Sequence, residues 1–311
     1  MPSPTSFDIR PAVAAALEAN LPVVAMVSSP LSHTLPWPTN LEAVRAASEA
    51  VRTEGATLAV IAVWKGRLTV GLEPEELEVL TRDSTVHRVS RRDLASAIVG
   101  GWNAGTTVST SMYIAWRAGI RVIASGAIGT ARTTQSNQSR TWDISSDLVE
   151  LSQTPVAVVC AGARSVSHMG YAAEVLDTFR VPIVGYRTDS FPTFYMSIGT
   201  SPVSSRVNTP VEAADFLRVH WSIDGAGAVL AQPTPADVAI SPDVLLPALR
   251  SVEEQADREG VMRKDLSLFL MDKLNRLTWG KALRAYQAIL VANARLAAQV
   301  ARELIGTKAK V

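Results

Sequence analysis

The sequence is poor in residues that commonly carry covalent chemistry. Its 311 residues include one cysteine and four histidines, and its 30 basic residues comprise six lysines and 24 arginines. A single cysteine, Cys160, excludes an internal disulfide framework, and its place inside an apolar run predicts a buried, unreactive thiol. Few lysines leave few amines for imine formation.

The chain also lacks a strong charge bias and long apolar runs. The net charge is +1 and no basic stripe is present, which argues against nucleic acid as a partner. No apolar run reaches the roughly 18 residues of a membrane span, and residues 1–9 lack a signal-peptide core. We therefore expect a soluble, cytoplasmic protein without a membrane partner. The length and 47% hydrophobic content suffice for one large α/β domain or two smaller ones.

The hydrophobic pattern alternates between expected strands and expected helices. Short apolar runs predict strands at 22–27, 121–125, 156–160, 181–186 and 228–231, and a hairpin at 57–71. Amphipathic segments predict helices between them, at 41–52, 75–82, 112–118, 170–179 and 211–221. The last part is helical throughout, at 242–259, 266–277 and 281–304. This order predicts an α/β fold with a helical C-terminal cover.

One polar stretch stands out, residues 141–147 (TWDISSD). Ser145 and Ser146 are typical of a helix start, where free backbone N–H groups favour an anion. Shortly afterwards a strand ends in small residues with Arg164 at its exit. Because ligands of open α/β sheets lie beyond the carboxyl ends of strands, these features predict a phosphate or phosphosugar site. Residues 105–111 add five hydroxyls before a helix, and the polar segment 130–140 is interpreted as a mobile loop over the site.

Two polar residues lie on the apolar stripe of the last helix. Tyr286 and Asn293 are two turns apart on this face. A buried asparagine must find hydrogen-bond partners. Asn293 therefore either fixes the packing of the helix or contacts a ligand ring.

Several segments together resemble the pseudouridine-5'-phosphate glycosidase family, over about residues 9–304. The segments that carry this resemblance are 32–40 (SHTLPWPTN), 88–94 (RVSRRDL), 106–110 (TTVST), 141–147, 158–163 (VVCAGA), 181–186 (VPIVGY) and 291–297 (VANARLA). The resemblance implies a single domain over 1–311, with a three-layer α/β/α fold, a mixed central sheet and usually a trimeric assembly. It also implies reversible cleavage of the bond between C1' of ribose 5-phosphate and C5 of uracil, with a divalent metal, Mn or Mg.

The sequence departs from that family where its chemistry lies. The resemblance implies an acid glutamate where Val27 stands, a Schiff-base lysine where Arg164 stands and a second lysine where Arg88 stands. Arg132 replaces a histidine, and Tyr286 replaces an asparagine that faces the uracil. An arginine stays protonated and cannot form an imine, and valine cannot move a proton.

The same resemblance implies that the residues binding a phosphosugar are retained. It implies that Asp143 is a metal contact. The expected substrate contacts are Val108, Ser145, Ser146, Asp147, Arg132, Tyr286 and Asn293. Arg88, Arg132 and Arg164 would add fork-shaped phosphate donors.

Three hypotheses follow. The leading one is a C-glycosynthase that joins ribose 5-phosphate to an aromatic, polyketide-type acceptor, with Arg164 and Arg88 polarising the open-chain aldehyde and Tyr286 stacking on the ring. His33, in the proline-rich loop, is either a further catalytic candidate or a structural loop residue. The second is a working pseudouridine-5'-phosphate glycosidase, for which Lys264 is the candidate amine. The third is a catalytically silent homologue that binds phosphosugar.

Overall fold

The computed structural model describes residues 7–136, 139–164, 169–199, 201–261 and 266–306. Their main sheet has eleven strands in the order β1-β4-β3-β2-β7-β10-β15-β11-β14, with β5 and β6 added beside β3. The strands are β1 (Phe7–Ile9), β2 (Val23–Val27), β3 (Thr57–Trp64), β4 (Arg67–Val70), β5 (His87–Val89), β6 (Ala104–Thr106), β7 (Val122–Ala124), β10 (Ala157–Cys160), β11 (Ile183–Tyr186), β14 (Ser205–Val207) and β15 (Ala228–Ala231). All pairs are parallel except those of β3 with β4 and β6. The predicted mixed sheet is therefore confirmed.

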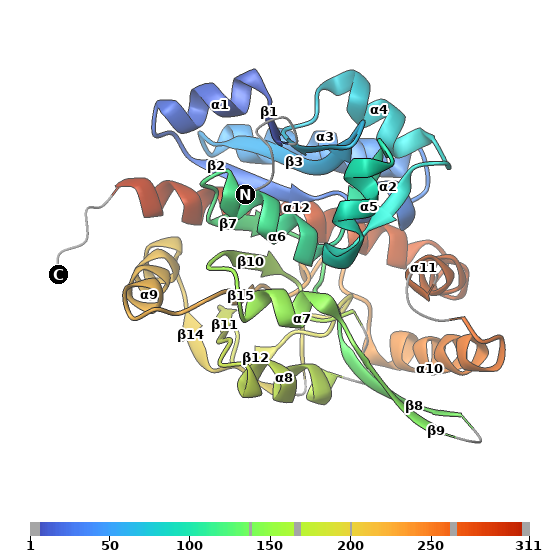
Figure 1. Ribbon diagram of the computed structural model, residues 1–311. Coiled ribbons are helices and arrows are strands. Elements are labelled where there is room, and N and C mark those ends of the chain that lie inside the picture. The colour runs from blue at the N-terminus through green and yellow to red at the C-terminus, as the bar shows by residue number, and fades with distance from the viewer. Residues whose placement is uncertain (1–6, 137–138, 165–168, 200, 262–265, 307–311) are drawn as a thin grey trace.

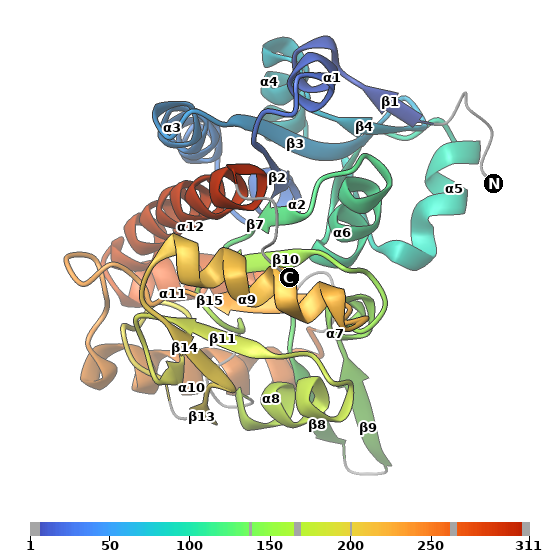
Figure 2. The same ribbon diagram turned by 90° about the vertical axis from the view of Figure 1, so that its left-hand side faces the viewer.

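Helices cover both faces of the sheet (Figures 1 and 2). One face carries α3 (Thr39–Thr53), α9 (Pro210–Ser222) and α12 (Lys281–Gly306). The other carries α1 (Pro11–Glu18), α6 (Val108–Arg117), α7 (Ser146–Leu151) and α8 (Met169–Thr178). The central strands are rich in valine, isoleucine and alanine and are buried on both sides, as parallel strands between helix layers require. The three-layer α/β/α prediction is confirmed.

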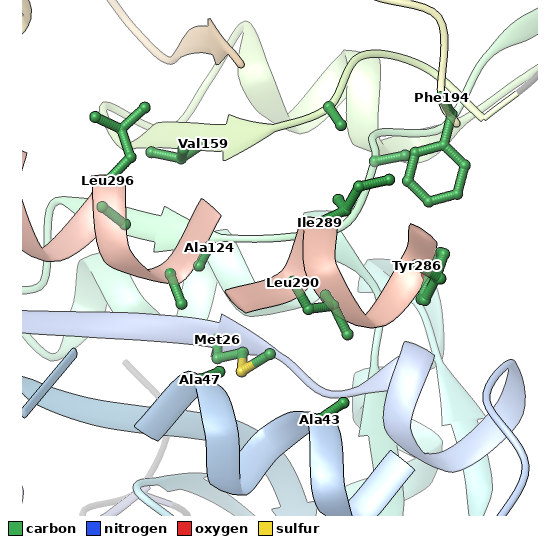
Figure 3. Packing of buried hydrophobic residues seen from close by; sticks show 14 of the residues in the cluster. Met26, Ala43, Ala47, Ala124, Val159, Phe194, Tyr286, Ile289, Leu290 and Leu296 are labelled. Carbon is green, nitrogen blue, oxygen red and sulfur yellow. The ribbon is translucent and has the colours of Figure 1, made fainter. Parts of the chain in front are cut away.

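The C-terminal cover consists of α10 (Pro242–Arg258), α11 (Leu266–Leu277) and α12. The apolar stripe of α12 packs between the sheet and α3, where Ile289, Leu290 and Leu296 meet Val159, Ala124 and the small residues of α3 (Figure 3). The buried Asn293 donates from Nδ2 to the carbonyl of Ser125 over 2.8 Å, which ties α12 to the end of β7. In the structure Asn293 thus makes the packing contact that was one of its two predicted roles.

Three local predictions are wrong. The proline-rich loop contains a short helix, α2 (Ser29–His33), and α6 begins at Val108, four residues earlier than predicted. The segment predicted to be a mobile loop forms the antiparallel hairpin of β8 (Ala131–Ser136) and β9 (Ser139–Ile144), which projects from the body (Figure 1). The segment after β11, for which no strand was predicted, contributes β14 to the main sheet and forms the pair β12 (Ser190–Phe191) and β13 (Ser201–Pro202). These segments are too short to show a periodic hydrophobic pattern, so their secondary structure could not be recognised from the sequence.

The remaining elements surround β5 and β6. Helix α4 (Pro74–Arg82) has the predicted amphipathic character and a capping box at its start. The 3₁₀ turn η2 (Arg91–Asp93) leads into α5 (Leu94–Val99), and Ser90 with Asp93 forms a capping box. Among the residues described, no helix combines the length and the apolar character that crossing a membrane requires.

Candidate functional site

The carboxyl ends of β2, β7 and β10 meet at one edge of the sheet. Beyond β7 runs the turn 126–129, and beyond β10 runs the segment 161–164. The two segments are joined by backbone hydrogen bonds, because Ile128 donates to Gly162 over 3.0 Å and Arg164 donates to Ile128 over 3.2 Å. The backbone of Arg164 is thereby fixed at the edge where ligands of open α/β sheets lie.

A cluster of hydroxyls and one carboxylate lies on one side of this turn; we call it the Asp147 cluster (Ser109, Gly129, Ser145, Ser146 and Asp147). Asp147 Oδ1 accepts the backbone N–H of Ser109 over 2.9 Å, and Oδ2 accepts that of Gly129 over 3.0 Å. The Ser145 hydroxyl caps α7 by accepting the N–H of Asp147 over 3.2 Å. Ser109 and Ser146 are 3.1 Å apart at their Oγ atoms. The Asp147 carboxylate thus joins the starts of α6 and α7 to the turn.

A second set of hydroxyl bonds fixes the start of α6 against β2 and β3. Ser28 Oγ accepts the N–H of Thr106 over 2.9 Å, and Thr106 Oγ1 donates to the carbonyl of Ile61 over 2.7 Å. Val108 follows as the first residue of α6 and is buried in the core. The hydroxyl-rich sequence before α6 therefore holds the first backbone N–H groups of that helix in place.

A small cavity lies on the other side of the turn; we call it the Tyr286 cavity. Its volume is about 10 Å³, the space of about one water molecule. The lining residues are Thr34, Arg164, Phe194, Tyr195, Leu270, Met271, Leu274 and Tyr286. Apart from Arg164 and Tyr286, these residues were not predicted from the sequence, because they come from the residue after α2, from a turn and from α11 without a shared motif.

Tyr286 is the most buried polar side chain of this cavity. It is 1% exposed, and its hydroxyl has no hydrogen-bond partner among the described residues. The ring meets Phe194 edge-on at 4.9 Å between centroids, as Figure 3 shows at the end of α12. Burial raises the pKa of Tyr286, while the charges of Arg164 and Arg88 lower it, so both guanidinium groups lie within electrostatic range of the ring.

The turn 126–129 connects the cavity to the Asp147 cluster. A methyl group at Gly126 would lie 3.2 Å from Tyr286 Oη, and one at Gly129 would lie 2.0 Å from Ser145 Oγ. Since three residues span at most roughly 10 Å of extended chain, the two groups of side chains belong to one site.

His33 lies at the end of α2, and its Nδ1 is 2.7 Å from Ser32 Oγ. Ser32 packs directly on Gly105, where a methyl group would come within 2.1 Å of Oγ. Gly105 pairs in register with Arg88 of β5. The structure therefore brings His33 to the strand that carries Arg88.

Arg91, which precedes α5, is engaged by two helices. Its Nε lies 3.5 Å from Oε2 of the buried Glu150 of α7, and its guanidinium stacks over Tyr113 of α6 at 3.5 Å from the ring centroid. Arg91 therefore links the start of α5 to α6 and α7. Arg92 is exposed and lies 3.4 Å from its neighbour Asp93.

Glu150 predicts a pH dependence of stability. Burial raises the pKa of this 5%-exposed carboxyl above its ordinary 4.5, although Thr154 and Arg91 lower it. A raised folded-state pKa gives stability that is complete below the unfolded value and lost as the pH rises through the folded value. We expect the free energy of unfolding of Glu150→Gln, minus that of the wild type, to increase between about pH 4 and about pH 7, because glutamine stays neutral. Urea unfolding at a series of pH values measures this difference, and a pH-independent difference would contradict the raised pKa.

Asp143 and Arg132 lie opposite each other in the β8–β9 hairpin, by their Cα register. The side chain of Arg132 lies outside the described part of the chain, as do His168 and Lys264. Asp143 is half-buried, and the described residues contain no group of three or more His, Cys, Asp or Glu that could hold a metal. Asp143 as a metal contact stays a prediction.

The described residues place neither a lysine nor a carboxylate in the Tyr286 cavity. Lys65 lies in an exposed turn, Lys281 is exposed, and Lys273 extends over Phe269. Val27 is 2% exposed and packs in the core. Burial raises the pKa of the Cys160 thiol to about 12, so this thiol is protonated and unreactive.

Together, fold and site define a three-layer α/β/α protein with an arginine-bearing polar site at the carboxyl edge of its sheet. The chain belongs to the Indigoidine synthase A like protein family, whose model matches residues 12–303. It is similar to the pseudouridine-5'-phosphate glycosidase of Caldanaerobacter subterraneus subsp. tengcongensis, with 40% identity over 299 residues and 96% of each chain covered. It is also similar to that of Escherichia coli, with 38% identity covering 97% of this chain and 96% of the relative.

Two solved structures share the fold. The prealnumycin C-glycosynthase AlnA in complex with ribulose 5-phosphate superposes with a TM-score of 0.84 and 29% identity, covering 97% of this chain and 98% of its own. An indigoidine synthase A-like protein of Thermotoga maritima superposes with a TM-score of 0.82 and 30% identity, covering 91% and 93%. The similar proteins thus include enzymes that act on a pseudouridine phosphate and one that forms C-glycosides.

Proposed function

We propose that the protein makes or breaks the C–C bond between C1 of ribose 5-phosphate and a ring carbon, with pseudouridine 5'-phosphate as the first substrate to test. One observation carries this proposal: the turn 126–129 joins the Asp147 cluster to the Tyr286 cavity. A sugar phosphate has two ends that need such different surroundings. Full-length similarity to pseudouridine-5'-phosphate glycosidases at about 40% identity supports the substrate class.

In this proposal the hydroxyl-rich end receives the phosphate. The hydroxyls of Ser145 and Ser146 supply neutral donors, and Arg88 adds charge from β5. Both oxygens of Asp147 already accept backbone N–H groups, those of Ser109 and Gly129, so the part of Asp147 is to hold the starts of α6 and α7 to the turn. Arg132 would add a cation from the hairpin.

The arginines set the chemistry of the other end. Arg164 cannot form an imine with C1, because a guanidinium stays protonated in proteins. It can stabilise negative charge on an aldehyde oxygen, as preorganised donors do. Bond making or breaking would then proceed through direct attack at the open-chain aldehyde, without a covalent enzyme intermediate.

A C-glycosynthase that uses an aromatic acceptor other than uracil is the second candidate. The buried Val27 and the Arg164 of the Tyr286 cavity favour it, since the described lining of this cavity contains neither a carboxylate acid nor an amine. An electron-rich ring carbon is itself a nucleophile and needs neither group. The structural likeness to AlnA supports the same idea.

The proposal also includes a hydrated divalent ion, Mn²⁺ or Mg²⁺, with Asp143 as the one protein ligand that we propose for it. Such ions keep several waters and bind through one or two carboxylates together with substrate phosphates. When bound, the ion would neutralise phosphate charge.

The test is incubation with pseudouridine 5'-phosphate and Mn²⁺, with uracil release followed by chromatography. The reverse mixture of uracil and ribose 5-phosphate runs beside it. We expect measurable but slow turnover, because no imine can form. Product only with a phenolic acceptor would replace the first proposal by the second. Absence of product with every acceptor, despite sugar binding, would indicate a silent phosphosugar-binding protein.

A further inference from the structure

The Tyr286 cavity has the size of one oxygen-bearing group. Its volume of about 10 Å³ suits one water molecule or one carbonyl oxygen. Most of its wall is aromatic or aliphatic, and the Tyr286 hydroxyl meets no hydrogen-bond partner among the residues described. A buried hydroxyl without a partner destabilises the folded protein. Such an arrangement is typical of a donor kept for a ligand.

We propose that Tyr286 Oη, with the charge of Arg164 beside it, binds the C1 oxygen of open-chain ribose 5-phosphate and donates a hydrogen bond to it. This inference rests on the proposed function and assigns the donor in that site. The Tyr286 ring is held in place by edge-on contact with Phe194 and by close packing on Gly126. The packing on Gly126 is tight, because a methyl group added to this glycine would lie 3.2 Å from Tyr286 Oη. A rigid donor costs little reorganisation during the reaction.

The hydroxyl is protonated at neutral pH. Burial raises the pKa of Tyr286 above that of an ordinary phenol, and the two arginines only partly offset this effect. Tyr286 therefore acts as a hydrogen-bond donor and not as a phenolate.

The chemical step then balances without an enzyme amine or carboxylate. The acceptor carbon attacks C1, the new C–C bond forms, and the π electron pair of the aldehyde moves onto the C1 oxygen. The proton displaced from the acceptor carbon ends on that oxygen, so the first product is an open-chain alcohol at C1. The C-glycoside forms when the 4-hydroxyl oxygen of the sugar bonds to C1 and the C1 hydroxyl leaves as water. Cleavage is the reverse: water adds at C1 as the ring opens, and the C–C bond then breaks. Tyr286 and Arg164 stabilise the developing negative charge, and one such donor contributes on the order of 10²–10³ in rate.

Tyr286→Phe tests the donor, and Tyr113→Phe is its matched control. Tyr113 lies on α6 outside the cavity, and its hydroxyl accepts a hydrogen bond from Arg117 over 3.3 Å. We expect kcat to fall roughly 10²–10³-fold in Tyr286→Phe, with the KM for ribose 5-phosphate within about threefold, and little change in Tyr113→Phe. Equal effects of the two substitutions would overturn the inference.

A second measurement separates bonding from folding. Since Tyr286→Phe removes an unsatisfied buried hydroxyl, its midpoint of thermal unfolding should be equal to or above that of the wild type.

The ¹³C NMR signal of ribose 5-phosphate labelled at C1 reports on the bond itself. In the wild type the bound aldehyde carbon should move downfield of the free aldehyde, and Tyr286→Phe should bind the sugar without that shift. Sugar bound to the wild type without the shift would overturn this inference while leaving the proposed function standing. Failure of the wild type to bind ribose 5-phosphate would overturn both.

Discussion

Replacing Arg164 with lysine is expected to create a covalent aldehyde trap. Arg164 lines the Tyr286 cavity, where apolar walls and the nearby charge of Arg88 would lower the pKa of a lysine amine. A neutral amine beside C1 of ribose 5-phosphate condenses to an imine with loss of water, and borohydride reduces the imine to a stable secondary amine. Mass spectrometry of the variant should show one reduced pentose phosphate on the peptide that contains residue 164. The wild type should show none there.

Two variants serve as controls for this trap. Arg206→Lys, in an exposed pair with Asp189, measures the slow reaction of any surface lysine with the sugar. Arg88→Lys tests whether a lysine elsewhere in the site suffices. Labelling of Arg164→Lys no faster than Arg206→Lys would show that C1 does not reach residue 164.

Removal of the Asp147 carboxylate is expected to cause the second large effect, a loss of stability. Asp147→Ala leaves the N–H groups of Ser109 and Gly129 without their acceptor in a site where Asp147 is only 8% exposed. We expect the free energy of unfolding to fall by roughly 2–4 kcal/mol, because each buried donor left unpaired costs roughly 1–3 kcal/mol. Ribose 5-phosphate binding should weaken as well, since the starts of α6 and α7 lose their common anchor.

The matched control for this loss is Asp215→Ala. Asp215 pairs with Arg218 on the surface of α9 and is 63% exposed. Its removal should change stability by about 0.5 kcal/mol or less. Chemical unfolding of both variants, with and without sugar, provides the comparison. If the two losses were similar, the Asp147 carboxylate would not be the anchor described.

Much of the fold could be predicted from the sequence, because long periodic segments define it. The strand 228–231 and the helix 266–277 agree with the structure at both ends. The hairpin β8–β9 could not be recognised, because its strands are polar and carry no apolar alternation. Helix α2 was not predicted, because its segment is rich in prolines. A proline is nevertheless compatible with the first positions of a helix.

The site was partly predictable for a related reason. Sequence motifs identified Arg164 and the serines at the start of α7, because helix starts and strand ends have local signatures. The cavity walls from Phe194, Tyr195 and α11 could not be predicted, since tertiary packing alone brings them to Tyr286. The hydrogen bonds to both oxygens of Asp147 could not be predicted either, because a sequence shows a carboxylate but not its partners.

The central claim is that one site holds the phosphate and the C1 end of ribose 5-phosphate. Titration calorimetry with ribose 5-phosphate, ribose and inorganic phosphate, each against the wild type and Arg164→Ala, tests it most directly. We predict clear binding of ribose 5-phosphate to the wild type, weak binding of either fragment, and a loss of at least about tenfold, or 1.4 kcal/mol, in the variant. Equal affinity for ribose 5-phosphate and inorganic phosphate, unchanged by the substitution, would contradict the account.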